Sequence, residues 1–558
     1  MKKSFKIFLC LLFFLIFPYR FIQSQTPYKS AVISSAHELA SQVGIDIIKQ
    51  GGNVVDAAVA VGFALAVVYP QAGNIGGGGF MVIQFADGNS ISIDYREKAP
   101  SSAKKDMFLD INGNVIEDLS TYTALASGVP GSVAGLLYAL EKYGSLSRDI
   151  VIAPAIELAE KGFRINSHFA SALKSFRGDF SRFESSKKIF GRKYRDGDLF
   201  VQKDLAETLR EISKNGKDGF YKGKIAGLIV DEMQRGNGII TLNDLAVYNP
   251  VERPVLKGTY RGYDITTMGP PSSGGICLIY LLNILENFNL RELGYYSASY
   301  VHILSEAMRR VYADRAEFMG DADFVAVPTD ILTSKVYAKR RIKDYNENKA
   351  STSKEVGHGD AYYRESDQTT HYSIADFKGN CVSVTTTLND LFGSRLVVDG
   401  AGFLLNNEMD DFSIKQGVPN IYGLVGSEAN SIAPNKRMLS SMTPTIITKN
   451  GRPFMVIGSP GGGRIITSVL QTILNVIDFE MPLEDAVSSW RIHHQWLPDK
   501  IQYENGAIDK EVIKQLKAMG HTVSEVGDFG RIEAIIFNPN GTLTGMSDLR
   551  GYGKAVGF

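Results

Sequence analysis

The hydrophobic and polar positions near the N-terminus predict two helices followed by a β-hairpin. In residues 36–50 apolar side chains recur at helical spacing, and the pattern stops at a glycine pair. Residues 54–68 are rich in alanine and valine, which predicts a second helix that is buried. Two strand-like runs, 80–85 and 90–95, flank Asp87-Gly88, a sequence typical of hairpin turns.

The stretch from residue 128 to about residue 345 has a mainly helical pattern. A Pro-Pro-Ser-Ser-Gly-Gly run opens one of the expected helices, and we find no internal repeat. Helical spacing of apolar residues predicts helices at 132–143, 150–161, 203–214, 225–235, 275–285 and 297–315.

The pattern changes after a polar run at 346–368, because strand alternation begins at once behind it. Residues 416–437 form a long loop, and long ordered loops in compact domains are often lids. The alternation predicts strands at 370–376, 381–388, 403–405 and 454–459, and a helix follows at 464–479.

The strand expected at 381–388 carries polar side chains on one face. Alternate residues of a strand share a face, so Thr387 and Asn389 are expected to point the same way. If this strand lies beside the one that opens at Thr369, the hydroxyl groups and the amide converge.

Composition indicates the broad class of protein. The chain has 558 residues, of which 44% are hydrophobic and 22% charged, which is ordinary for a globular protein with a large core. Length alone suggests about three domains, and one large layered domain is equally compatible with it. Lys+Arg and Asp+Glu both number 60, so nothing favours nucleic acid or an anionic membrane surface as a partner.

The N-terminus has the features of a secretory signal, which we place at residues 1–24. Lysines precede an apolar run at 7–17 that is too short for a spanning helix of about 20 residues. We therefore expect export to the periplasm or beyond, without stable membrane insertion; an uncleaved anchor is the alternative. Only Cys277 and Cys381 would remain after cleavage, so one disulfide is possible. No zinc-type spacing of Cys and His occurs, and we expect no metal and no cofactor.

The junction at Gln368-Thr369 is the first candidate for chemistry. A threonine hydroxyl needs a neighbouring base, and a free N-terminal amine, with a pKa of about 7.7–8.0, supplies one. Cleavage of the Gln368–Thr369 bond would create that amine, and the same hydroxyl can attack the Gln368 carbonyl. On spacing alone, a Thr-Thr pair at a strand start is more often a pair of ordinary strand residues.

A glycine run between a strand and a helix is the second candidate. The backbone N–H groups of Gly461 and Gly462 can hold a developing oxyanion, and a simple tight turn is the alternative. The third candidate is a polar set suited to an amino acid, although each member is by itself more often a solvated or capping residue. Arg96, Ser440 and Ser441 suit an α-carboxylate, and Asn389, Glu408 and Asp411 suit an α-ammonium.

Ordered motifs along almost the entire mature chain carry a family resemblance. The chain resembles the γ-glutamyltranspeptidases (glutathione hydrolases) of the N-terminal nucleophile hydrolase superfamily. The motifs lie at 76–81, 94–97, 128–132, 271–275, 369–373, 388–389, 404–412, 439–445 and 458–464.

The resemblance implies a four-layer αββα sandwich built from two products of one precursor. Thr369 would be the nucleophile and the first residue of a small subunit, 369–558, paired with a large subunit, 25–368. Thr387 would assist the nucleophile, and the N–H groups of Gly461 and Gly462 would form the oxyanion hole.

The resemblance also assigns the substrate pocket. Tyr422 and its loop match the lid over the glutamyl pocket of many bacterial members. Some relatives carry Gln where Glu408 stands, so that position varies. Arg96, Ser440 and Ser441 would hold the α-carboxylate of the γ-glutamyl group, and Asn389, Glu408 and Asp411 its α-amine.

The implied activity is cleavage of the γ-glutamyl amide of glutathione and related compounds. The acyl group would pass from a Thr369 ester to water or to an amino acid or dipeptide acceptor. Two enzymatic alternatives share the scaffold: a cephalosporin (glutaryl) acylase and a poly-γ-glutamate hydrolase. A third alternative is an unprocessed binding protein with an inactive site, against which the intact Thr369, Thr387, Gly461 and Gly462 argue.

Overall fold

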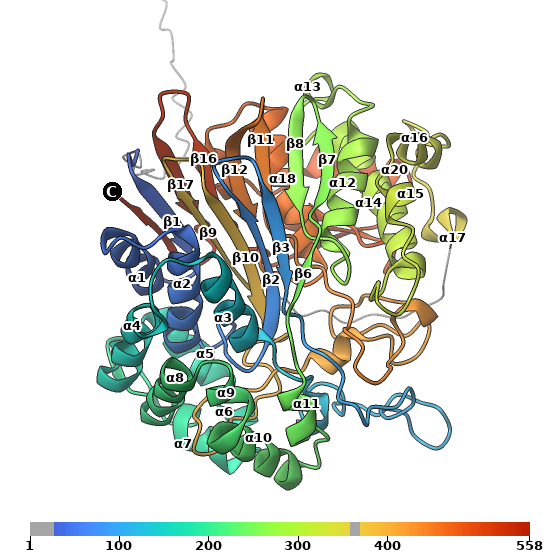
Figure 1. The fold of residues 1–558 in the computed structure, drawn as a ribbon. Helices are drawn as coiled ribbons and strands as arrows, with labels where there is room; N and C mark the ends of the chain where they lie inside the picture. Colours follow the sequence, from blue (N-terminus) through green and yellow to red (C-terminus); the bar gives the residue numbers. More distant parts are fainter. Residues whose placement is uncertain (1–26, 358–368) are drawn as a thin grey trace, which may run out of the picture.

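Two β-sheets pack face to face, and helices cover the outer face of each (Figure 1), so the fold is a four-layer αββα sandwich. The computed structural model describes residues 27–357 and 369–558. Segments that lie far apart in the sequence are neighbours in both sheets, because each sheet combines strands from before and after residue 369.

The first sheet is antiparallel throughout and has the strand order β18-β1-β9-β10-β2-β3-β6. Its strands are β1 (Ala31–Ser35), β2 (Gly78–Gln84), β3 (Ser90–Asp94), β6 (Val251–Arg253), β9 (Thr370–Asp376), β10 (Cys381–Thr387) and β18 (Lys554–Gly557).

The second sheet has the order β17-β16-β12-β11-β8-β7 and is also antiparallel. Its strands are β7 (Leu256–Tyr260), β8 (Tyr263–Thr267), β11 (Thr445–Lys449), β12 (Arg452–Gly458), β16 (Glu533–Phe537) and β17 (Leu543–Ser547). Smaller sheets join β13 (Ile492–His493), β14 (Ile501–Glu504) and β15 (Val523–Val526), and β4 (Phe163–Arg164) and β5 (Leu199–Phe200).

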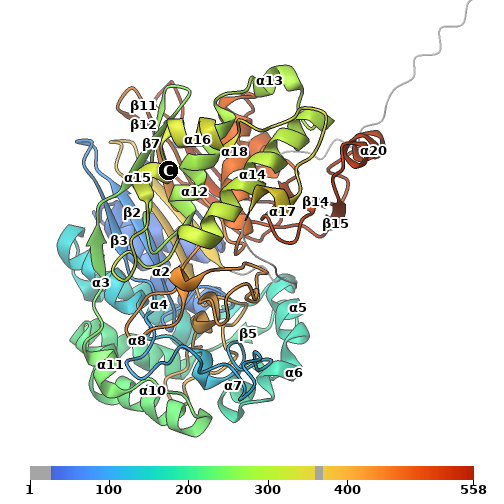
Figure 2. The same ribbon diagram turned by 90° about the vertical axis from the view of Figure 1, so that its right-hand side faces the viewer.

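Helices from the first half of the chain cover the first sheet and extend below it (Figures 1 and 2). They are α1 (Glu38–Lys49), α2 (Val54–Val68), α3 (Ser132–Tyr143), α4 (Arg148–Lys161), α5 (Ser167–Ser175), α6 (Arg177–Phe180), α7 (Glu184–Phe190), α8 (Lys203–Asn215), α9 (Asp218–Tyr221), α10 (Gly223–Gly236) and α11 (Leu242–Ala246).

The other outer layer covers the second sheet, with α12, α14 and α18 as its main helices (Figure 1). The helices beyond α11 are α12 (Gly274–Leu285), α13 (Leu290–Leu293), α14 (Ala298–Phe318), α15 (Thr329–Leu332), α16 (Lys335–Arg341), α17 (Ser353–Val356), α18 (Arg464–Ile477), α19 (Leu483–Ser488) and α20 (Lys510–Ala518). None of the helices in the described ranges is both long enough and apolar enough to cross a membrane.

The boundaries of α2 show how local sequence sets an element. Asn53 caps its first turn, because the side-chain oxygen accepts hydrogen bonds from the N–H groups of Val55 and Asp56. Asp56 returns a bond to the N–H of Asn53, which completes a capping box. Every residue of the helix is buried, as its alanine and valine content predicts.

Both faces of the first sheet are buried, so its alternating residues feed two different cores. Ile33, Ile374 and Val384 join the core under α2, whereas Val32 and Ala375 join the core that the second sheet shares with α12 and α18. Because both faces are covered, β9 and β10 are buried along almost their whole length.

Several predictions about elements were wrong in instructive ways. The mainly helical interpretation of 128–345 missed β6, β7 and β8, which are short strands at sheet edges or next to them. The strand expected at 403–405 is only an isolated bridge between Val397 and Leu404. The long loop expected at 416–437 is confirmed, apart from a short 3-10 helix, Glu428–Asn430.

Two further expectations concern cysteines and the termini of the two proposed subunits. Cys277 and Cys381 are buried free thiols, so the possible disulfide is absent. The proposed signal peptide, 1–24, and Gln368 lie outside the described residues.

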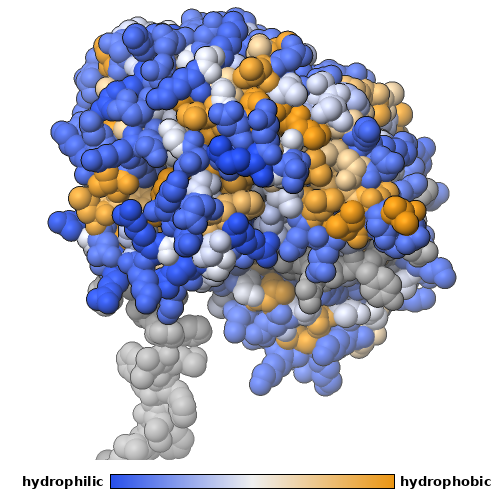
Figure 3. Space-filling model, turned by 90° about the horizontal axis from the view of Figure 1, so that it is seen from below, coloured by the Kyte–Doolittle hydropathy of each residue, from blue (hydrophilic) through white to orange (hydrophobic). Residues whose placement is uncertain are grey.

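The lower face of the molecule, which α5–α11 help to form, is mostly hydrophilic with separate hydrophobic areas (Figure 3). Isolated exposed apolar side chains are normal for soluble proteins. This face therefore does not point to a particular partner.

Candidate active site

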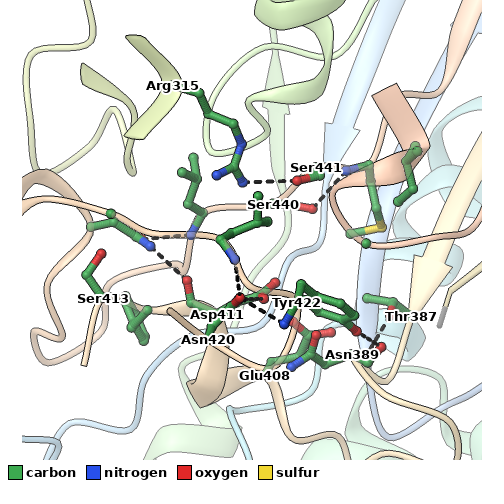
Figure 4. Close-up of a pocket in the computed structure, with 18 of the residues that line it drawn as sticks. Arg315, Thr387, Asn389, Glu408, Asp411, Ser413, Asn420, Tyr422, Ser440 and Ser441 are labelled. Atoms are coloured by element: carbon green, nitrogen blue, oxygen red, sulfur yellow. Dashed lines mark hydrogen bonds between the residues drawn. The ribbon is translucent and has the colours of Figure 1, made fainter. Parts of the chain in front are cut away.

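A cavity lies at the end of the first sheet where β9 begins and β10 ends. The two strands are antiparallel neighbours, and Thr370 pairs with Thr386. Thr369 and Thr387 therefore lie at the same end of the strand pair. Most of the residues singled out in the sequence line this cavity (Figure 4). They are Arg96, Thr369, Thr387, Asn389, Glu408, Asp411, Tyr422, Ser440, Ser441 and Gly462.

The two threonines and Asn389 occupy the inner wall. Thr369 and Thr387 are buried, and the Thr387 hydroxyl oxygen accepts a hydrogen bond from the N–H of Asn389 at 2.8 Å. Asn389 has a φ of 76°, so it leaves the strand direction and does not share the strand face as expected. Its side-chain amide donates to the carbonyl of Asn407 at 3.0 Å. This turn, rather than strand alternation, places Asn389 on the cavity wall.

Arg96 is surrounded by carboxylates. It follows β3, and its Nη1 lies 2.6 Å from Glu408 and 3.5 Å from Glu97. Its Nη2 lies 2.5 Å from Asp411. Glu408 and Asp411 are presented by a 3-10 turn, Glu408–Asp411, so one buried guanidinium meets three acidic side chains.

Burial and crowding change the acidity of this cluster. Removal from water raises the pKa of Glu408 well above its usual value, although Arg96 opposes the shift. Burial likewise raises the pKa of Asp411 and takes the pKa of Glu97 to about 7. When they are ionised, three carboxylates around one guanidinium carry excess negative charge, which suits a ligand that brings an ammonium group.

Ser440 and Ser441 lie on a loop that the segment before α12 holds in place. The N–H of Ser440 donates to the carbonyl of Pro271 at 3.0 Å, and the Ser273 hydroxyl donates to the Ser440 carbonyl at 2.6 Å. The Ser440 hydroxyl oxygen accepts from the N–H of Met442 at 3.2 Å. Both serine side chains therefore border the cavity on a loop with fixed backbone.

The glycine run lies between β12 and α18, directly before the first turn of the helix. Gly461 and Gly462 have φ values of 131° and 50°, which side chains other than glycine rarely adopt. A Cβ on Gly462 would also lie 2.5 Å from the Tyr422 ring. Gly462 lines the cavity, and Gly461 is its neighbour but is not among the lining residues.

The loop that carries Tyr422 is fastened over the cavity. The Tyr422 hydroxyl donates to the Asn389 carbonyl, and Gln495 donates to the Tyr422 carbonyl at 3.2 Å. Asn420 donates to Asp411 at 2.9 Å, and the N–H of Ile421 donates to Asp410 at 2.8 Å. This loop therefore contacts the same acidic turn that meets Arg96.

One group in the described ranges has the composition of a metal site, and it lies apart from the cavity. His302, Glu306 and His521 bring ligand atoms within 4.8 Å of one another. These atoms already have partners, because His302 and His521 share a 2.7 Å hydrogen bond, and Glu306 pairs with Arg309 and Arg310.

Sequence reasoning missed several residues that shape the cavity, namely Arg315, Asp410, Asn420 and Asn430. Asn430 donates to the Asp411 carbonyl at 2.7 Å and accepts from the N–H of Leu439 at 2.9 Å, so it joins two walls. Asp410 was visible only as part of an acidic run, and Arg315 only as a charge at the end of an expected helix.

The chain is similar to known proteins along most of its length. The family model described as Gamma-glutamyltranspeptidase matches residues 40–558. A glutathione hydrolase proenzyme from Escherichia coli K12 is 50% identical over 526 residues, covering 94% of this chain and 90% of the relative.

Two solved structures extend the comparison. The γ-glutamyltranspeptidase of Helicobacter pylori is 49% identical with a TM-score of 0.58, covering 60% of this chain and 97% of that chain. A cephalosporin acylase from Bacillus halodurans superimposes with a TM-score of 0.85 at 26% identity, covering 98% of this chain and 99% of that chain.

Proposed function

Because this chain belongs to the γ-glutamyltranspeptidase family, we propose that it is a self-processing enzyme that cleaves the γ-glutamyl amide of glutathione and related compounds. The observation that carries the proposal is a single cavity in which Thr369 faces an amino-acid-shaped set of charges. The acyl group leaves as glutamate, or is transferred to an amino acid or dipeptide.

In the proposed reaction Thr369 forms a covalent ester. Its hydroxyl attacks the γ-carbonyl carbon, and its own α-amine, with a pKa of about 7.7–8.0, accepts the hydroxyl proton. The amide nitrogen leaves with a proton, and water or an amine then attacks the ester. Thr387 borders the nucleophile, and the N–H groups of Gly461 and Gly462 are assigned to the negatively charged oxygen of the tetrahedral intermediate.

The charges of the cavity support selection for γ-linked glutamyl groups. Such a group presents both an α-ammonium and an α-carboxylate beyond the scissile amide. Glu408, Asp411 and Asn389 are assigned to the ammonium, and Arg96, Ser440 and Ser441 to the carboxylate. Since the acids near Arg96 have raised pKa values, an arriving ammonium favours their ionised forms and releases protons.

We further propose that the Gln368–Thr369 bond is cut to give a large subunit, 25–368, and a small subunit, 369–558. The sheet topology supports a stable heterodimer after this cut. In the first sheet, β1 lies between β18 and β9, and β10 pairs with β2. In the second, β8 pairs with β11. Strands from both proposed subunits contribute to each sheet, so separation would break both sheets.

The proposed location is the periplasm or the extracellular space, following a signal peptide at residues 1–24. The basic and apolar pattern of that segment is the support for it.

The alternative activities fit the cavity less well. A glutaryl group has a carboxylate but no ammonium, so it offers nothing to offset the excess negative charge around Arg96. A poly-γ-glutamate chain needs an open site, whereas Asp410, Asp411 and Gln495 fasten the Tyr422 loop.

A Thr369→Ala variant tests the proposal. It should remain a single chain and lose γ-glutamyl anilide hydrolysis by at least about a thousandfold, because nucleophile and base are both lost. Denaturing gels and N-terminal sequencing follow processing, and glutamate release follows turnover, with and without glycylglycine as acceptor. The matched Thr369→Ser variant keeps a hydroxyl and should retain measurable processing.

Two results would contradict the assignment. One is cleavage of the Thr369→Ala chain at the same bond, which would show that another group makes the cut. The other is a wild-type protein that persists as one full-length band, which would favour an inactive binding protein.

A further inference from the structure

Arg315 is a buried arginine on the carboxylate side of the cavity. It lies near the end of α14, only 4% of it is exposed, and it is one of the cavity-lining residues. In Figure 4 its guanidinium faces the loop of Ser440 and Ser441. No motif or spacing in the sequence singled it out.

Two hydrogen bonds fix the Arg315 guanidinium. Its Nη2 donates to the Ser441 hydroxyl oxygen at 3.0 Å, and its Nε donates to the Ser273 hydroxyl oxygen at 2.9 Å. A serine hydroxyl has one proton to donate and accepts through its lone pairs. Because Arg315 can only donate, the Ser441 proton must point elsewhere, and an anion in the cavity can receive it.

The charge of Arg315 is matched differently from that of Arg96. Among the residues that the structure describes, Arg315 forms no ion pair with a carboxylate, whereas Arg96 pairs with Glu408 and Asp411. A buried charge is costly unless it is paired. Arg315 still acts across the cavity, because its charge helps to oppose the burial-driven rise in the pKa of Asp411.

We propose that Arg315 is the second cationic determinant of α-carboxylate recognition, acting through Ser441 as a positioning residue. It orients the Ser441 hydroxyl as a donor and supplies positive charge that carboxylates do not already neutralise. This inference rests on the proposed γ-glutamyl specificity and refines it, because the carboxylate would be read by two arginines with different roles.

Three anilides with matched acyl groups separate this role from simple loop support. The γ-glutamyl anilide has both α-substituents, the glutaryl anilide keeps the carboxylate alone, and the 4-aminobutyryl anilide keeps the ammonium alone. Where turnover of an analogue is slow, its inhibition constant against the γ-glutamyl anilide replaces its KM.

Arg315→Gln should raise KM for the γ-glutamyl and glutaryl anilides about ten- to hundredfold, the range expected for a lost hydrogen bond to a charged group. The kcat for the γ-glutamyl anilide should change much less, and the constant for the 4-aminobutyryl anilide should stay within about twofold. Arg315→Lys keeps the charge but loses the two-point hydrogen bonding, so its KM values should lie between those of the wild type and Arg315→Gln. If Arg315→Gln is not processed, Arg315→Lys provides the same comparison.

A double-mutant cycle tests the route through Ser441. Arg315→Gln combined with Ser441→Ala should be little worse than the weaker-binding single variant, because both remove one interaction. Equal losses for all three anilides, no loss for any, or full additivity with Ser441→Ala would overturn the proposal. A wild-type enzyme without γ-glutamyl hydrolysis would instead overturn the proposed function.

Discussion

The cavity and the interior of α14 both bury several charged side chains, yet they balance those charges to different degrees. In the cavity one guanidinium, Arg96, meets three carboxylates. Within α14, Arg309 lies between Glu306 and Asp499, and Arg310 lies between Glu306 and Asp344. We call this second set, Glu306, Arg309, Arg310, Asp344 and Asp499, the α14 cluster.

The α14 cluster connects segments on either side of Thr369. Asp499 lies 2.8 Å from Arg309 and accepts from the N–H of Ser353 at 2.6 Å. The Trp496 ring N–H donates to the Ser353 carbonyl at 2.9 Å. If the chain is cut before Thr369, these contacts would hold the end of the large subunit against the small one.

The comparison shows that buried charge alone does not mark an active site. The α14 cluster satisfies its charges within the chain, which favours a structural role. The cavity leaves negative charge around Arg96 and a guanidinium at Arg315 without a carboxylate partner among the described residues. Unmatched charge that borders a cavity is the feature that calls for a ligand.

The largest effect should come from the α14 cluster. Glu306→Gln leaves Arg309 and Arg310 without their shared carboxylate, which should lower the free energy of unfolding by about 3–5 kcal/mol. The kcat/KM for a γ-glutamyl anilide should stay unchanged. Urea midpoints and melting temperatures measure the loss. Glu428→Gln removes an exposed pair with Lys105 and serves as the control, with an expected cost below about 1 kcal/mol. A wild-type urea midpoint for Glu306→Gln would contradict the structural role assigned to the α14 cluster.

Arg96→Ala tests the role of the charges in the cavity and should have the next largest effect. It leaves Glu97, Glu408 and Asp411 without their guanidinium, so kcat/KM should fall about thirty- to a hundredfold, chiefly through KM. Processing should stay intact, as denaturing gels would show. Arg96→Lys keeps the charge and should recover part of the loss. Unchanged saturation kinetics for the alanine variant would refute the assigned role.

The smallest effect, taken per pH unit, is a pair of opposite pH dependences of stability. Burial raises the pKa of Asp410, which accepts a hydrogen bond from the N–H of Ile421, to about 7. The folded state therefore keeps a proton that the unfolded state releases at lower pH. Stability should then fall as pH rises to about 7. Burial lowers the pKa of His494, beside Asp499, to about 4, so stability should fall as pH drops from its ordinary value of 6.5. Each slope approaches about 1.4 kcal/mol per pH unit.

Urea midpoints of Asp410→Asn and His494→Gln between pH 4.5 and 7 separate the two slopes. Asp410→Asn should reduce the loss of stability that accompanies rising pH. His494→Gln should reduce the loss of stability that accompanies falling pH. Parallel curves for both variants and the wild type would show that neither group titrates as its burial requires.

Local sequence was sufficient wherever one segment sets its own structure. The bounds of α2 and β9 agree with prediction, because a cap, apolar runs and glycine turns act over a few residues. The edge strand β7 was missed because its exposed residues alternate with half-buried ones and Gly258 interrupts it. The buried charges of α14, Glu306, Arg309, Arg310 and Arg315, were missed because charged helix residues are usually solvent-exposed.

The sequence by itself determined the ordered motifs, the junction at Thr369 and the residue types suited to an amino acid. Tertiary structure decided which of these charges meet. Arg96 and Asp411 are 315 positions apart in the chain, and their pairing depends on where β3 and the acidic turn pack. The same packing brings α14 beside the Ser441 loop. Contacts between distant segments follow from the burial of whole layers, which no local pattern encodes.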